Sequence, residues 1–183
     1  MTEKAIFFDR DGTIMVEKGF LADPAGVVLI EGAVEALKLA TSLGYRLFVV
    51  SNQSGVARGL MTEADVKAVN NRLIELLQTE GVILDGLYYC PHHPDYTGPC
   101  DCRKPKRGMV DRALAQHEIS LADSYVIGDC RSDMKLAFNI GAGSVMVKTG
   151  YGAEVCDQFG EDRCPDHVAD DILAAVEWIA QNE

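Results

Sequence analysis

The run Ala5-Ile6-Phe7-Phe8, followed directly by Asp9-Arg10-Asp11-Gly12-Thr13, decides the fold. The apolar run has the length of a short buried strand, and the two aspartates come where that strand ends. In open α/β sheets the carboxyl ends of the strands face the crevice that binds ligands. Alternation along the chain sends Asp9 and Asp11 to the same face, and Gly12 lets the backbone turn away.

The two neighbouring carboxylates indicate a cation site. Two like charges about 4 Å apart repel by roughly 4 kcal/mol at an effective dielectric of about 20. A hard cation with oxygen ligands, such as Mg²⁺, offsets this repulsion. A plain turn is the alternative interpretation of Asp11 and Gly12, because Asp-Gly is common between two elements.

Length and composition predict one globular domain with a substantial core. The chain has 183 residues, of which 48% are hydrophobic. Its net charge of −11 argues against sequence-independent binding of nucleic acid or of an anionic membrane. No apolar run approaches a membrane span, and the amino terminus has no signal-peptide pattern, so we expect a cytoplasmic protein. In that compartment the six cysteines should be thiols or metal ligands, not disulfides.

Apolar runs alternate with stretches of helical periodicity, which is typical of a parallel sheet covered by helices. We expect strands at residues 4–8, 45–50, 86–90, 124–127 and 144–147. We expect helices near residues 32–43, 62–80, 107–117, 132–140 and 170–181. The sequence therefore predicts an α/β fold.

Capping residues and irregular segments refine this prediction. Thr62 can cap the second helix with Asp65 at the capping-box position, and Asp170 or Asp171 can cap the last helix.

Two segments, residues 12–31 and 90–108, do not fit the alternation, and long irregular loops in compact domains are usually functional. Because each follows a strand, both should rim the same end of the sheet.

Two further polar groups stand in places that suit the binding of phosphate. Ser51-Asn52-Gln53 follows the second expected strand, where a hydroxyl and backbone amides can hold phosphate oxygens. Arg103-Lys104-Pro105 is a basic pair in an acidic chain, and lysine and arginine both neutralise phosphoryl groups. The alternative for Ser51-Asn52 is an ordinary turn, and the alternative for Arg103-Lys104 is a solvated surface pair.

Val126-Ile127-Gly128-Asp129 ends the fourth expected strand with another acid. Asp129 at a strand end can reach the same cation as Asp9, while Asp133 can support that site from behind. The competing role for either acid is to cap a helix, and we favour this role for Asp133.

Three cysteines and two histidines form a second constellation within residues 90–102. Cys90, Cys100 and Cys102, with His92 or His93, would give the closed Cys₃His set of a structural zinc site. Because such a site has no open position, the zinc should fold the loop without acting in catalysis. Buried free thiols are the alternative. Since Cys102 is bonded to Arg103, a zinc ion here would also fix where the basic pair points.

Together these segments resemble the haloacid dehalogenase superfamily of aspartate-nucleophile phosphotransferases. The pattern of that family is Asp-x-Asp-Gly-Thr, then Ser or Thr, then Lys, then Gly-Asp-x₃-Asp. Here residues 9–13, Ser51, Lys104 and residues 128–133 match it in order. The resemblance covers about residues 4–180. It implies a Rossmann-like three-layer sandwich with a parallel central sheet and no large cap domain, a single phosphatase domain over residues 1–183 with a zinc-binding loop at 90–108.

The resemblance also implies roles for individual residues. Asp9 is expected to attack phosphorus and become an aspartyl phosphate, and Asp11 to act as the acid and base toward the leaving oxygen and water. Ser51 and Lys104 are expected to bind the phosphoryl oxygens. Mg²⁺ is expected between the carboxylates of Asp9 and Asp129 and the backbone carbonyl of Asp11.

The zinc set narrows the resemblance to the branch of histidinol phosphate phosphatases and heptose bisphosphate phosphatases, and it favours His92 as the ligand. Residues 51–59 and 88–94 look like the heptose enzymes. One departure is Cys130, where those enzymes often have lysine. We therefore expect hydrolysis of the 7-phosphate of a heptose 1,7-bisphosphate on the way to a nucleotide-activated heptose for surface glycans.

The expected partner is a small phosphorylated sugar, without nucleic acid or membrane, and the expected state is a monomer. The candidate substrate contacts lie on the loops that follow the first two strands and beside the zinc set: Glu17, Lys18, Gly19, Phe20, Asn52, Gln53, Ser54 and Arg103.

Three other functions compete with this interpretation. The first is dephosphorylation of histidinol phosphate. The second is a non-catalytic zinc-stabilised binding module, against which the retention of both Asp9 and Asp11 argues. The third is a nucleic-acid 3′-phosphatase, which the acidic composition and the absence of a basic groove disfavour.

Overall fold

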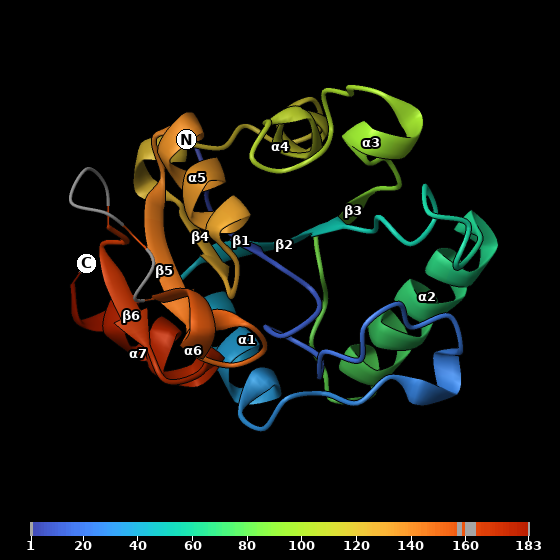
Figure 1. The fold of residues 1–183 in the computed structure, drawn as a ribbon. Helices are drawn as coiled ribbons and strands as arrows, with labels where there is room; N and C mark the ends of the chain where they lie inside the picture. The colour runs from blue at the N-terminus through green and yellow to red at the C-terminus, as the bar shows by residue number, and fades with distance from the viewer. Residues whose placement is uncertain (1, 157–158, 160–163, 183) are drawn as a thin grey trace.

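A computed structural model describes residues 2–156, 159 and 164–182 of the chain. These residues contain one six-stranded sheet of order β3-β2-β1-β4-β5-β6, in which every neighbouring pair is parallel (Figure 1). The strands are β1 (Lys4–Phe8), β2 (Tyr45–Asn52), β3 (Gly86–Cys90), β4 (Tyr125–Gly128), β5 (Gly143–Val147) and β6 (His167–Ala169).

Helices connect the strands. The longer helices are α1 (Ala33–Ser42), α2 (Glu63–Thr79), α4 (Gly108–Leu114), α5 (Arg131–Ile140) and α7 (Ile172–Gln181). The short ones are η1 (Pro24–Gly26), α3 (Pro94–Thr97), η2 (Leu121–Asp123) and α6 (Gly152–Val155). Among the described residues, no helix combines the length and the apolar character that crossing a membrane requires.

The sheet has a hydrophobic core on each face, because neighbouring side chains of a strand point in opposite directions. Ile6 and Phe8 of β1 pack into one core with α1, α2 and α7. Ala5 and Phe7 pack into the other core with α4 and α5. The prediction of a three-layer sandwich around a parallel sheet is therefore confirmed.

The five expected strands and five expected helices are all present, with ends shifted by a few residues. Strand β6 and helices α3 and α6 were not predicted, because they have only three or four residues and so show no periodicity. The predicted capping box is confirmed, since the Asp65 amide donates to the Thr62 hydroxyl and the Thr62 amide donates to the Asp65 carboxylate. At the last helix it is Asp171 that acts as the cap.

The order of the strands positions the site. β1 lies between β2 and β4, so that Phe8 pairs with Val49 on one side and with Ile127 on the other. The carboxyl ends of these three strands therefore meet at one edge of the sheet. The segments of residues 12–31 and 90–108 begin at this edge, and in the described chain they contain only η1 and α3 as helices.

Replacing Thr62 by Ala should lower the stability of the fold. The change removes the acceptor for the Asp65 amide, and loss of an N-cap costs about 1 kcal/mol. For a domain of this size, Tm should fall by about 2–4 °C in thermal unfolding followed by circular dichroism. Thr79→Ala, at the other end of α2, is the control, because the Thr79 hydroxyl donates to the Glu75 carbonyl and caps no amide. An equal fall of Tm in both variants would contradict the capping role.

Candidate active site

A cavity of about 320 Å³ opens at the carboxyl ends of β1, β2 and β4. Both irregular segments, residues 12–31 and 90–108, contribute to its wall, which confirms that they rim the same end of the sheet. The lining residues are Asp9, Asp11, Glu17, Gly19, Phe20, Ser51, Asn52, Gln53, Ser54, Arg103, Lys104, Asp129, Cys130, Ser132 and Tyr151.

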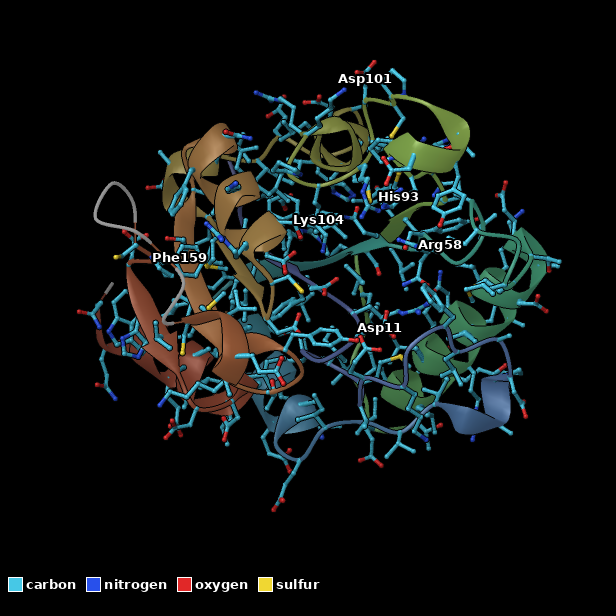
Figure 2. All side chains as sticks on the ribbon, in the orientation of Figure 1. Asp11, Arg58, His93, Asp101, Lys104 and Phe159 are labelled. Carbon is cyan, nitrogen blue, oxygen red and sulfur yellow. The ribbon has the colours of Figure 1, made fainter. Side chains whose placement is uncertain are left out.

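Lys104, labelled in Figure 2, is a buried residue that lines this cavity and pairs with two carboxylates. Its Nζ lies 2.7 Å from Asp9 Oδ1 and 2.6 Å from Asp133 Oδ1. Burial disfavours the charged form of the amine, but the charges of Asp133 and Asp9 outweigh this effect and raise the Lys104 pKa. These ion pairs favour the charged form of Lys104, whose ammonium lies next to the carboxylate that follows β1.

Asn52 holds the backbone of Lys104 in place. The Lys104 amide donates to Asn52 Oδ1 at 2.9 Å, and Asn52 Nδ2 donates to the Lys104 carbonyl at 3.2 Å. The end of β2 therefore anchors the segment that delivers the ammonium. This contact gives Asn52 a structural task in addition to its place on the cavity wall.

Asp133 does not have the position predicted for it. Helix α5 begins at Arg131, with Cys130 as the N-cap residue, so that Asp133 is the third helical residue. Its Oδ2 accepts the Cys130 amide at 3.0 Å, and its other oxygen pairs with Lys104. Burial raises the pKa of Asp133 to about 6, against the opposing effect of the Lys104 charge. The prediction that Asp133 is the N-cap is wrong, because Cys130 is the N-cap and Asp133 is the third helical residue, whose carboxylate completes the capping box.

Asp129 has the environment of a cation ligand. Its Oδ2 accepts the Tyr151 amide at 2.8 Å, while Oδ1 is buried without a hydrogen-bond partner. Burial, followed by the charge of Asp9, raises the pKa of Asp129 to about 8. A Cβ on Gly12 or Gly150 would lie 2.3 or 2.1 Å from Oδ2, so the backbone can enclose this carboxylate only with glycine. An orphaned carboxylate oxygen beside a second carboxylate fits a hard divalent cation such as Mg²⁺.

Asp11 is joined to β2 and to a buried arginine. Gln53 Nε2 lies 2.8 Å from Asp11 Oδ2 and 2.8 Å from Ser51 Oγ, which links the two loop ends across the cavity. Arg10 Nη2 lies 2.9 Å from Asp11 Oδ2. Burial raises the pKa of Asp11, and although Arg10 opposes this effect, the charge of Asp9 adds to it. A carboxyl with a raised pKa is suited to carrying a proton.

Several residues in or behind the cavity were not predicted from the sequence. Arg10 lies between two acids at a position that alternation assigns away from them, and its side chain is only 1% exposed. Asn70 accepts a hydrogen bond from Arg10. The only sequence signal for this contact is that an amide side chain stands on the apolar face of helix α2. Ser132, at an unspecified position of the Gly-Asp-x₃-Asp motif, also lines the cavity, as does Tyr151 from a segment in which no motif was recognised.

Seven of the eight predicted substrate contacts line the cavity: Glu17, Gly19, Phe20, Asn52, Gln53, Ser54 and Arg103. Burial and the Asp11 charge raise the pKa of Glu17. Lys18 is the exception, since its Nζ donates to the Gly26 carbonyl at 2.8 Å on the exposed side of the loop.

The three predicted cysteine ligands come together. Their sulfur atoms are 2.8 Å (Cys90–Cys102), 3.6 Å (Cys90–Cys100) and 3.7 Å (Cys100–Cys102) apart. Zinc–sulfur bonds of about 2.3 Å in a tetrahedron give sulfur–sulfur edges of about 3.8 Å. The Cys90–Cys100 and Cys100–Cys102 distances match this value, and a bound ion would increase the Cys90–Cys102 distance. The donor set therefore fits zinc.

The histidines near this cluster have different environments. No histidine of the described residues joins the three sulfurs within 4.8 Å. His93 Nε2 contacts Arg58 Nη2 at 3.3 Å (Figure 2), and His93 Nδ1 accepts the Asp95 amide at 3.3 Å. The contacts of the His93 ring are thus with Arg58 and Asp95, outside the cluster. The His92 carbonyl accepts Arg103 Nη1 at 3.3 Å, which connects the cysteine loop to the cavity wall.

Comparisons with known proteins agree with this geometry. Residues 101–175 match a family model described as HAD-hydrolase-like. The chain is 38% identical over 185 residues to a D-glycero-D-manno-heptose-1,7-bisphosphate 7-phosphatase of Chlorobaculum tepidum, covering 94% of this chain and 92% of that one. It is 41% identical over 152 residues to the D-glycero-beta-D-manno-heptose-1,7-bisphosphate 7-phosphatase of Escherichia coli (strain K12), covering 80% of each.

A solved structure shares the whole fold. The D,D-heptose 1,7-bisphosphate phosphatase of B. bronchiseptica, crystallised with magnesium and phosphate, superposes with a TM-score of 0.88 at 30% identity, covering 98% of this chain and 99% of that one. The family assignment rests on the fold, on the cavity at the ends of β1, β2 and β4, and on the similarity along nearly the entire chain. The chain belongs to the haloacid dehalogenase-like hydrolases, in the family of the heptose-1,7-bisphosphate 7-phosphatases.

Proposed function

We propose that this chain is a Mg²⁺-dependent phosphatase that removes the 7-phosphate of D-glycero-D-manno-heptose 1,7-bisphosphate. The observation that carries the proposal is the meeting of Asp9, Asp11, Asp129 and Lys104 in one cavity. Similarity to phosphatases named for this substrate supports it along 94% of the chain. The product, a heptose 1-phosphate, would feed the synthesis of nucleotide-activated heptose for lipopolysaccharide or another surface glycan.

In the proposed reaction, a carboxylate oxygen of Asp9 attacks the phosphorus while the bond from phosphorus to the sugar oxygen breaks. Asp11 gives a proton to the leaving oxygen and later removes one from the water that hydrolyses the aspartyl phosphate. The Ser51 hydroxyl and the Lys104 ammonium bind the phosphoryl oxygens and stabilise the charge of the transition state. The raised pKa of Asp11 supports its part in this scheme.

The carboxylates of Asp9 and Asp129, with the backbone carbonyl of Asp11, would hold Mg²⁺. When bound, the ion would neutralise charge on the phosphoryl group. The buried oxygen of Asp129 that has no hydrogen-bond partner supports this assignment.

We further propose a structural zinc ion bound by Cys90, His92, Cys100 and Cys102. The gathering of the three sulfurs supports it, and the contacts of the His93 ring with Arg58 and Asp95 favour His92 over His93 as the fourth ligand. A closed site of this kind stabilises the loop that carries Arg103 and Lys104.

Loops, and not a cap domain, would select the substrate. Arg103 lines the cavity next to the cysteine cluster and would receive the second phosphate of the bisphosphate. Histidinol phosphate carries cationic groups that Arg103 would repel, which is why the heptose substrate is favoured. The six other lining residues predicted to contact the sugar are Glu17, Gly19, Phe20, Asn52, Gln53 and Ser54. Residues 1–183 would act as one domain, while the monomeric state and the cytoplasmic location stay predictions from the sequence.

Asp9→Asn and Asp11→Asn should each abolish steady-state phosphate release. The first change removes the nucleophile and the second the proton carrier, and acid–base catalysis alone contributes about 10²–10⁴-fold. Phosphate release from the heptose bisphosphate with Mg²⁺ measures the effect. Asp111→Asn, on the exposed pair with Arg107, is the control and should retain activity. Substantial turnover by Asp9→Asn would refute the covalent mechanism.

Cys100→Ser should lower both the zinc content and kcat. Structural zinc in finger peptides contributes about 10–16 kcal/mol of apparent binding free energy, so its loss would loosen the loop that holds Arg103 and Lys104. Elemental analysis of untagged protein, alongside phosphate release, gives the two readouts. Cys164→Ser, at an exposed cysteine, is the matched control. Wild-type protein without zinc would show that the metal assignment is wrong.

Arg103→Ala should reduce kcat/KM for the bisphosphate about 10- to 100-fold, since charge-assisted hydrogen bonds contribute about 1.5–3 kcal/mol. The loss should be much smaller for a heptose monophosphate that lacks the second anion. Arg107→Ala, four residues along the chain and paired with Asp111 on the surface, is the control. Equal losses on both substrates, or a preference of the wild type for histidinol phosphate, would favour the alternative function.

A further inference from the structure

A buried polar pair lies behind the cavity and joins the segment that follows β1 to helix α2. The Arg10 side chain is 1% exposed and that of Asn70 is 5% exposed. Arg10 Nη1 donates to Asn70 Oδ1 at 2.6 Å. None of the cavity-lining residues identified in the described chain belongs to α2, so neither the substrate nor a bound ion accounts for this contact.

The other two nitrogens of Arg10 hold the Asp11 carboxylate. Nε donates to Oδ2 at 3.0 Å, and Nη2 donates to Oδ1 at 3.1 Å. This forked contact of a planar guanidinium with a planar carboxylate fixes the orientation of the carboxylate as well as its place. All three guanidinium nitrogens are thus committed, two to Asp11 and one to Asn70.

The hydrogen bond with Arg10 explains why the polar side chain of Asn70 is buried. It lies on the face of α2 whose other buried residues are Val66, Val69, Leu73 and Leu77. A buried amide is unfavourable unless it is hydrogen-bonded, and an apolar residue would pack at this position without that cost. Its oxygen is directed to Arg10, and Arg10 to Asp11.

We propose that Asn70 and Arg10 are positioning residues that set the plane of the Asp11 carboxylate. The inference rests on the proposed function, in which Asp11 exchanges a proton with the leaving oxygen. Asn70 holds the outer end of the guanidinium, and the guanidinium holds the carboxylate. Through this chain of contacts, a helix that contributes no residue to the cavity wall controls a proton transfer inside it.

The leaving group provides a specific test of this role. When the bond between phosphorus and the sugar oxygen breaks, its electron pair goes to the oxygen, and Asp11 supplies the proton. A sugar alkoxide is strongly basic and needs this proton in the transition state. The p-nitrophenolate ion is a weak base and leaves without it. A misoriented Asp11 should therefore slow cleavage of the sugar ester and spare cleavage of the aryl ester.

The experiment compares Asn70→Leu with Asn71→Leu in single-turnover cleavage of heptose bisphosphate and of p-nitrophenyl phosphate. Small misplacements of catalytic groups cost up to about 10²-fold, so Asn70→Leu should slow cleavage of the sugar ester about 10- to 100-fold. The rate with the aryl ester should change less than about twofold by the same reasoning. Asn71 is the exposed neighbour on the same helix and should change neither rate.

Two more variants separate positioning from simple loss of structure. Asn70→Asp keeps an oxygen that accepts from Arg10 and should restore most of the sugar-ester rate. If Asn70→Leu does not fold, as judged by circular dichroism, Asn70→Ser carries the same comparison, because its short side chain does not reach Arg10.

Asp11→Asn serves as the reference for the proposed function. If it cleaves both esters at wild-type rates, the role given to Asp11 fails. If Asp11→Asn spares only the aryl ester while Asn70→Leu slows both esters equally or neither, the positioning role is overturned and the proposed function stands.

Discussion

The ion pairs of Lys104 with Asp9 and Asp133 are the interactions on which the site depends. The lysine is almost fully buried, and a buried charge is strongly unfavourable unless it is paired. It comes from an irregular segment, so that its place is set by Asn52 at one side and by the cysteine cluster that ends at Cys102. One loop therefore carries both the proposed zinc site and the Lys104 ammonium that pairs with Asp9, the proposed nucleophile. Disorder at the zinc site would displace this ammonium.

The parts of the site that lie next to strand ends could be predicted from the sequence. Asp9, Ser51 and Asp129 each follow or end an apolar run, and in a parallel sheet the carboxyl ends of such runs meet at one edge. The cysteines of residues 90–102 were likewise predictable, because a set of thiols close together in the chain needs little knowledge of the fold. The local sequence pattern and the direction of the strands were sufficient to predict that these residues meet.

Contacts between segments far apart in sequence could not be predicted in the same way. Asp133 was expected to be the N-cap of a helix, but it is the third residue of α5, where one oxygen accepts the Cys130 amide and the other pairs with Lys104. Arg10 and Asn70 are 60 residues apart, and their contact depends on how α2 packs on β1. Lys18 lies in an irregular loop, and the path of this loop brings its amine to the Gly26 carbonyl. Packing and loop geometry, which leave no periodic pattern, decided each of these cases.

The crowding of acids around Asp129 has a consequence for folding itself. Its unpartnered oxygen faces the charge of Asp9 in the folded protein, whereas in the unfolded chain both carboxylates are separated and hydrated. An ion that binds only the folded state stabilises it by an amount that grows with the logarithm of the free ion concentration. Folding and occupancy of the proposed Mg²⁺ site would therefore be linked equilibria, and the proportion of folded chains would depend on the divalent cations around the protein.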